Sequence, residues 1–119
     1  MPSPPLAPDD GPLDFEHLKR MTLDDAGLEH EVLAMFAAQS AKLIATLAGL
    51  PKDGGNDAPT LAHTLKGSAR AIGAFGVADA ATRLEAVLAD GDDPSRELAE
   101  LGEAVALARA AIEAVLRRS

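Results

Sequence analysis

The chain of 119 residues contains no cysteine, no tryptophan and no tyrosine, and its only aromatic side chains are three phenylalanines. Without cysteine, the protein has neither a disulfide framework nor a metal site built from thiolates. With so few aromatic side chains, its core must consist of leucine, valine, isoleucine and alanine, a combination that suits closely packed helices. Hydrophobic residues make up 47% of the sequence, as in a globular protein rather than a disordered one.

Positive charge is also scarce, because 11 lysines and arginines stand against 19 aspartates and glutamates and leave a formal net charge of −8. An acidic surface without a dense basic cluster repels a phosphate backbone, so we expect no nucleic acid partner. No apolar stretch is long enough to suggest a membrane span, and the N-terminus lacks the basic and apolar regions of a signal peptide. We therefore expect a cytoplasmic protein that does not bind a membrane.

Proline is concentrated at the N-terminus, where it occupies five of the first twelve positions. We interpret residues 1–12 as a flexible leader and residues 13–119 as one domain. Beyond the leader, apolar residues recur every three or four positions, and no segment alternates as a strand does. The predicted helices cover residues 14–21, 25–50, 57–75, 77–89 and 98–116. This pattern predicts an all-α fold, an antiparallel up-down four-helix bundle with a short extra N-terminal helix.

The predicted helix at residues 57–75 has one face that we expect to be buried. Successive residues of a helix lie about 100° apart, which brings four side chains into one sector. These are Leu61, Leu65, Ser68 and Ile72. In the preceding helix, Met35 and Phe36 belong to the apolar stripe and are expected in the core.

His63 lies almost opposite that buried sector, and Lys66, Gly67 and Arg70 follow it at offsets that share its face. A neutral imidazole nitrogen is nucleophilic near neutral pH and can attack phosphorus. A lysine one turn away offers a cation to the transferring phosphoryl oxygens. Gly67 leaves open space beside the imidazole, and a glycine inside a helix costs about 1 kcal/mol relative to alanine. The residue therefore indicates a role other than helix stability.

A carboxylate is expected level with this histidine. If the chain reverses near Ala74, His63 and Glu85 are each eleven residues from the turn, on two antiparallel helices. A glutamate in that place accepts a hydrogen bond from the second ring nitrogen, which selects one tautomer and orients the imidazole. We therefore predict that Glu85 supports His63.

The run HTLKGSA at residues 63–69, followed by IGA at 72–74 and by Val77, resembles the signature of histidine phosphotransfer (HPt) domains. The resemblance extends from Asp14 to about Leu116 and includes the Leu84–Glu85 pair. It implies that His63 is the phosphorylated residue and that Lys66 and Gly67 support it. Some members of the family have Glu or Gln where Glu85 stands, so the resemblance also allows a supporting role for Glu85.

The resemblance implies a phosphorelay intermediate. His63 is expected to accept a phosphoryl group from the aspartate of one receiver domain and to pass it to another, the partners being hybrid histidine kinases and response regulators. Ala62, Thr64, Gly67 and Arg70 are the predicted receiver contacts, together with unassigned residues of the helix that contains Phe36. We expect no cofactor in this chain, Mg²⁺ on the receiver, and a monomer. No ATP-binding motif occurs, so the chain is expected to be a phosphocarrier and not an enzyme.

Two alternatives remain open from the sequence. One is the phosphorylatable domain of a chemotaxis-type kinase whose catalytic core is a separate chain, and the other is a helical adaptor or inhibitor that does not use its histidine. A kinase dimerisation helix pair fits less well, because Thr64 stands where that class has an acidic residue. His17 and His30 have no ligand spacing with His63, so no metal is assigned.

Overall fold

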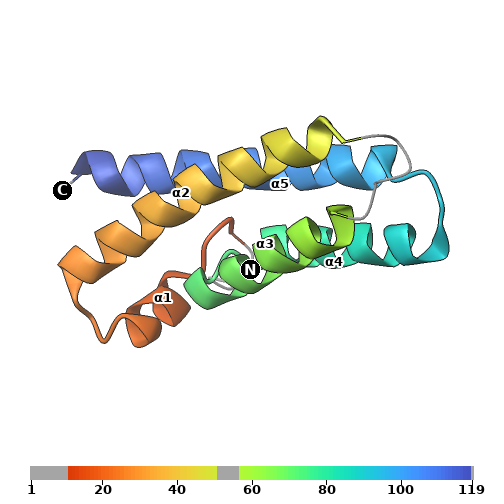
Figure 1. Cartoon of the computed structure of the whole chain (residues 1–119). Coiled ribbons are helices and arrows are strands. Elements are labelled where there is room, and N and C mark those ends of the chain that lie inside the picture. The colour runs from red at the N-terminus through yellow and green to blue at the C-terminus, as the bar shows by residue number, and fades with distance from the viewer. Residues whose placement is uncertain (1–10, 51–56, 119) are drawn as a thin grey trace, which may run out of the picture.

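The computed structural model describes residues 11–50 and 57–118, and within these ranges the chain forms five α-helices and no β-strand. The helices are α1 (Phe15–Met21), α2 (Ala26–Ala48), α3 (Ala58–Ile72), α4 (Phe75–Asp90) and α5 (Ser95–Arg118) (Figure 1). The all-α prediction is confirmed. The proposed leader falls, up to residue 10, outside the described residues, and the division of the chain at residue 13 stays a prediction.

The four long helices pack as a closed ring, in which α2 contacts α3, α3 contacts α4, α4 contacts α5, and α5 returns to α2. Figure 1 shows α2 with α5 in one layer and α3 with α4 in the other, successive helices running in opposite directions. The short helix α1 packs against α3 at one end. The predicted up-down bundle with an extra N-terminal helix is therefore confirmed.

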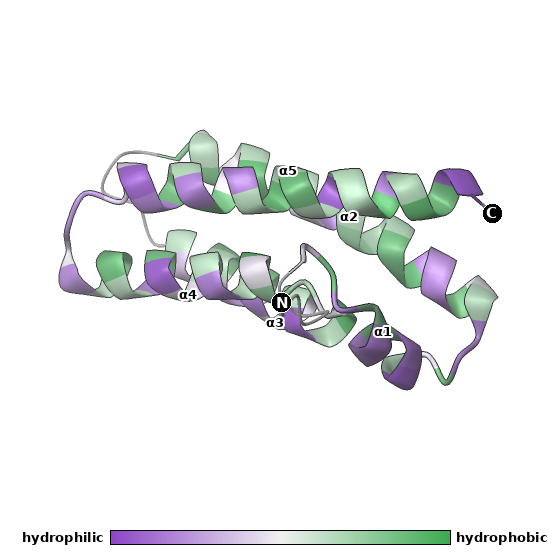
Figure 2. Ribbon diagram, turned by 180° about the vertical axis from the view of Figure 1, so that it is seen from behind, coloured by the Kyte–Doolittle hydropathy of each residue, from purple (hydrophilic) through white to green (hydrophobic). Residues whose placement is uncertain are grey.

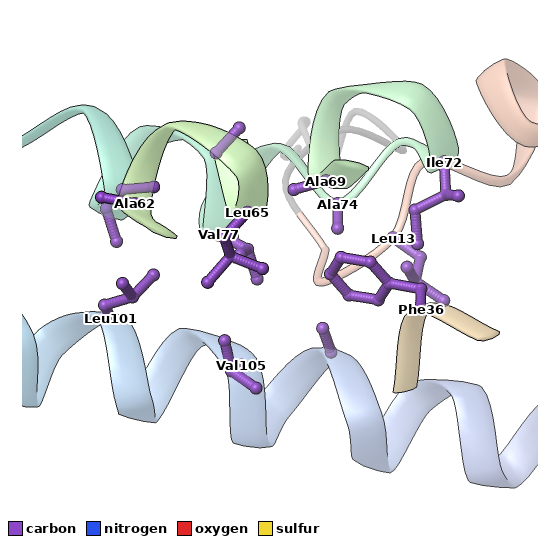
Figure 3. Packing of buried hydrophobic residues seen from close by; sticks show 14 of the residues in the cluster. Leu13, Phe36, Ala62, Leu65, Ala69, Ile72, Ala74, Val77, Leu101 and Val105 are labelled. Atoms are coloured by element: carbon purple, nitrogen blue, oxygen red, sulfur yellow. The ribbon is translucent and has the colours of Figure 1, made fainter. Parts of the chain in front are cut away.

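The most extensive helix contact joins α3 to α4, and small side chains line both sides of it. The buried residues of α3 are Ala58, Ala62, Leu65, Ala69 and Ile72, and those of α4 include Ala78, Ala80 and Ala81. Alanines at a contact let two helix backbones approach closely, so they occupy its centre. Figure 3 shows Ala62, Leu65 and Ala69 directed into the bundle interior, on the side of Leu101 and Val105.

This contact corrects the expected buried sector of α3. Leu65 and Ile72 are buried as expected, but Leu61 and Ser68 are only half-buried, and Ala62 and Ala69 take the central places. Helical spacing alone favours burial of the large side chains on this helix. In the folded bundle Ala62 and Ala69 are completely buried, and the larger Leu61 lies at the margin of the buried face.

The reversal between α3 and α4 depends on Gly73, which has a left-handed backbone with φ of 87°. This conformation is easy for glycine and ends α3 three residues earlier than predicted. The Gly73 carbonyl accepts a hydrogen bond of 2.8 Å from the Asp14 backbone N–H. Asp14 is also the N-cap of α1, as predicted, and its side chain accepts from the His17 N–H. One residue thus starts α1 and attaches it to the turn that follows α3.

Of the described helices, α2 alone has the length and apolar composition that a membrane crossing requires. No such segment was expected from the sequence. The helix packs against both α3 and α5, and Figure 2 shows it as mostly hydrophobic beside the mostly hydrophilic α1. A bundle helix that contacts two neighbours needs a wide apolar face, so its composition is a weak indication of a membrane span.

We predict that Gly73→Ala destabilises the protein more than Gly91→Ala. Both glycines have positive φ, for which an alanine costs about 1–2 kcal/mol. A Cβ on Gly91 meets nothing within 4 Å, whereas one on Gly73 lies 2.7 Å from the Asp14 carbonyl oxygen. This clash adds roughly 1–3 kcal/mol. Urea unfolding of the two variants measures the difference, and equal losses would show that the attachment of α1 contributes nothing to stability.

Candidate functional site

His63 lies in the second turn of α3, and its side chain is 71% exposed. The neighbouring positions Ala62 and Leu65 are both buried completely. Because these two residues point into the bundle, the side chain between them points outward. The sequence prediction of an outward-facing histidine is confirmed, and the ring is accessible to a partner.

Glu85 of α4 connects His63 and Lys66, two residues of this face. Its Oε2 lies 3.2 Å from His63 Nδ1, and its Oε1 lies 2.7 Å from Lys66 Nζ. The carboxylate is 24% exposed and the lysine 18%, so the pair is partly shielded from solvent. The register predicted by counting from Ala74 is correct, since it brings Glu85 to His63. The structure adds the ion pair with Lys66, which the sequence argument did not identify.

The surroundings of Glu85 favour its ionised form. Partial burial raises the pKa of this carboxyl, but hydrogen bonds from Lys66 and His63 and the charges of both residues lower it more. The net result is a pKa below the usual range of glutamate. An ionised carboxylate only accepts hydrogen bonds, so the imidazole proton belongs on Nδ1. When the ring is neutral, the other ring nitrogen, Nε2, carries the lone pair.

Gly67 lies one turn beyond His63 and is exposed. A Cβ added at this position meets nothing within 4 Å, so no packing contact inside the protein requires a glycine there. The interior of a helix disfavours glycine by about 1 kcal/mol relative to alanine. The open surface beside the imidazole agrees with the expected clearance for a partner, and that role stays a prediction.

The four residues predicted to contact a partner divide into two groups. Thr64, Gly67 and Arg70 are exposed on α3, on the same side of the bundle as His63. Ala62 has no exposed surface at all. Its predicted role as a partner contact is therefore wrong, because its side chain is part of the tight packing inside the bundle.

A groove between α2 and α3 was not predicted from the sequence. It is lined by Val32, Met35, Phe36, Gln39, Ser68, Ala71 and Ile72. Phe36 is buried as expected, but the Met35 side chain is 69% exposed, so its predicted place in the core is wrong. Adjacent helix positions point about 100° apart, and only one of the two can face the bundle axis. The clue in the sequence is this adjacency of two large apolar residues.

No group of three or more histidine, aspartate and glutamate side chains suited to a metal ion occurs in the described part of the chain. The ring of His17 packs against the ring of Phe75, with 5.2 Å between the two centroids. His17 and Phe75 therefore belong to the contact between α1 and the start of α4, away from the His63 face.

Comparison with known families gives one match. A family model described as Hpt domain matches residues 31–118, which run from the second turn of α2 to the end of α5. The matched segment includes His63, Lys66, Gly67 and Glu85, while α1 precedes it. Comparisons with curated proteins and with solved structures find no match.

The lowered pKa of Glu85 predicts a pH-dependent contribution to stability. A carboxyl whose pKa is lower in the folded state stabilises the protein above its unfolded pKa, and this contribution is lost as the pH falls through the folded pKa. We expect Glu85→Gln to lower the free energy of unfolding by about 1 kcal/mol at pH 7. The difference from wild type should shrink below about pH 4.

Urea unfolding at several pH values measures this difference. Asp79→Asn is the matched control, since Asp79 lies on the same helix, is 69% exposed and pairs with Arg83. Its loss should change stability less than Glu85→Gln does. A constant difference between Glu85→Gln and wild type from pH 7 to pH 3 would contradict the assignment.

Proposed function

The chain belongs to the Hpt domain family, whose members act in histidine phosphotransfer of two-component signalling, and we propose that His63 is the residue that carries the phosphoryl group here. His63 accepts it from the aspartyl phosphate of one receiver domain and passes it to the aspartate of another. The observation that carries this proposal is the exposed imidazole with Nδ1 held 3.2 Å from the Glu85 carboxylate. This arrangement leaves Nε2 as the nucleophile.

The transfer to His63 proceeds by attack of Nε2 on phosphorus. The bond between phosphorus and the aspartyl oxygen breaks, and its electron pair leaves with the receiver's carboxylate. The Nδ1 proton stays in its hydrogen bond to Glu85, which stabilises the positive charge that develops on the ring. Glu85 therefore orients the imidazole and raises its basicity.

Lys66 supplies the positive charge beside the reacting atoms. Its ammonium, already ordered by Glu85 at 2.7 Å, lies one turn from His63 on the same face of α3. Charge on the phosphoryl oxygens is the main feature of this transition state, and a preordered cation stabilises it without a large reorganisation. Mg²⁺, which receivers need, is expected to bind to the acidic site of the receiver and not to this chain.

The groove between α2 and α3 is the proposed docking surface for the receiver. It includes Ser68 and Ala71, which neighbour Gly67 and Arg70 on α3, and the exposed Met35 on α2. An apolar groove along the helix that carries the accessible nucleophile suits a partner that must bind and then leave. Such an interface is expected to be modest in area and transient.

Phosphotransfer from purified receiver domains tests the proposal. Receivers are phosphorylated with radiolabelled acetyl phosphate, an acyl phosphate like their own aspartyl phosphate, and mixed with this protein. We expect label that is labile in acid and stable in base, none on His63→Ala, and none on wild type incubated with ATP alone. Label on His63→Ala would overturn the assignment of the site. Label from ATP alone would overturn the carrier function.

A second prediction concerns docking. Met35→Glu places a charge in the apolar groove and should raise the receiver concentration that gives half the maximal transfer rate by about tenfold, since each factor of ten is about 1.4 kcal/mol. Direct phosphorylation of His63 by phosphoramidate, which needs no docking surface, should not change. Leu107→Glu, at a similarly exposed leucine on α5, is the control. If both variants weaken transfer equally, the groove is not the docking surface.

A further inference from the structure

The contact between Glu85 and His63 has a second chemical consequence once Nε2 is phosphorylated. In the free protein Nδ1 lies 3.2 Å from a carboxylate oxygen of Glu85, a contact in which the ring nitrogen donates its proton. Formation of the Nε2–P bond uses the lone pair of Nε2 and makes the ring a cation for as long as Nδ1 keeps its proton. Whether the proton stays decides how readily the phosphoryl group leaves.

The leaving group explains why the proton matters. If Nδ1 keeps its proton, cleavage of the Nε2–P bond returns the electron pair to Nε2 and releases a neutral imidazole. If Nδ1 has lost its proton, the same cleavage must release an imidazolate anion, a far stronger base and a poorer leaving group. A transfer catalyst therefore benefits from an anion that retains the proton on the phosphorylated ring.

Resting on the proposed function, we propose that Glu85 keeps the Nδ1 proton on phosphorylated His63 and so maintains it as a phosphoryl donor above neutral pH. In the onward step, the receiver's aspartate oxygen forms a bond to phosphorus, the Nε2–P bond breaks, and the ring departs neutral with its proton still on Nδ1. Glu85 is thus a positioning residue that acts through the imidazole and does not touch the phosphoryl group.

The charges around His63 single out Glu85 for this role. On α4, Arg83 pairs with Asp79 and Glu100 and not with the histidine. On α3, the ammonium of Lys66 is paired with the other Glu85 oxygen, and Arg70 is two turns away. The half of α2 that follows Phe36 has Lys42 as its single charged residue. Among the described residues, Glu85 is therefore the anion in contact with the ring.

Lys66 keeps Glu85 able to perform this function. Burial alone raises the pKa of the carboxyl, whereas hydrogen bonds and charge from Lys66 and His63 lower it by more. The carboxylate therefore remains ionised when it accepts a hydrogen bond from the cationic ring. The ion pair between Lys66 and Glu85, already present in the free protein, thus keeps the carboxylate charged in the phosphorylated protein as well.

The first test measures the ring proton directly. Protein with ¹⁵N-labelled histidine is phosphorylated on His63 with phosphoramidate, and ¹⁵N NMR follows the Nδ1 signal of the phosphorylated ring as the pH rises. Glu85→Gln keeps a side chain of similar size whose carbonyl still accepts from Nδ1 but carries no charge. We expect wild type to lose the proton about one to three pH units higher than Glu85→Gln, the range for an adjacent opposite charge.

The second test measures transfer of the phosphoryl group to a purified receiver as a function of pH. At a pH well above both midpoints, lowering the midpoint by about one pH unit reduces the protonated fraction of the ring about tenfold. At pH 8.5 the phosphoryl transfer rate of Glu85→Gln should therefore be lower than that of wild type by a factor of about ten or more. Near pH 6 the two rates should approach each other. Glu85→Ala should also transfer more slowly than wild type at high pH, and Asp79→Asn should show the same pH dependence as wild type.

The outcomes separate the two proposals. Equal NMR midpoints for wild type and Glu85→Gln, or rates that differ by the same factor at every pH, overturn the role of Glu85 in the phosphorylated state and leave the carrier function intact. Failure of His63 to take label from any receiver or from phosphoramidate overturns the proposed function, and the further inference with it.

Discussion

The close contact between α3 and α4 is the constraint on which the site depends. Alanines at Ala62, Ala69 and Ala78 let the two helices approach, and the turn at Gly73 and Ala74 sets their register. This register brings the Glu85 carboxylate to 3.2 Å from His63 Nδ1. A looser contact or a register shifted by one turn, about 5.4 Å along a helix, would separate these groups. The packing of the interior therefore determines the chemistry of the surface.

A single carboxylate, that of Glu85, contacts both the histidine and the lysine of the site. Each oxygen of Glu85 has its own partner, Lys66 Nζ at 2.7 Å and His63 Nδ1 at 3.2 Å. The cation keeps the carboxylate ionised, and the carboxylate orients both the nucleophile and the cation. The three side chains thus depend on one another, and replacing any one of them changes the electrostatic surroundings of the other two.

Most of the fold and the central residue of the site were predictable, because both depend on local pattern. Helical periodicity identifies each helix, and outward orientation of His63 follows from its spacing to Leu65. The main errors concern which side chains face the interior. Ala62 was expected at the surface and Met35 in the core, and the structure reverses both. A helical wheel ranks residues by hydrophobicity, whereas the distance between two backbones decides which side chain fits at their contact.

The sequence by itself determined the helices, their order, the tight reversal at Gly73 and the face on which His63 and Gly67 lie. These features follow from propensity, periodicity and backbone freedom, which act over a few residues. Only the tertiary structure decided the pairing of Glu85 with Lys66, the groove beside Met35 and the attachment of α1 to the turn after α3. Each of these joins residues of different helices, so it depends on how close the helices lie and how they are rotated about their axes, which no single segment specifies.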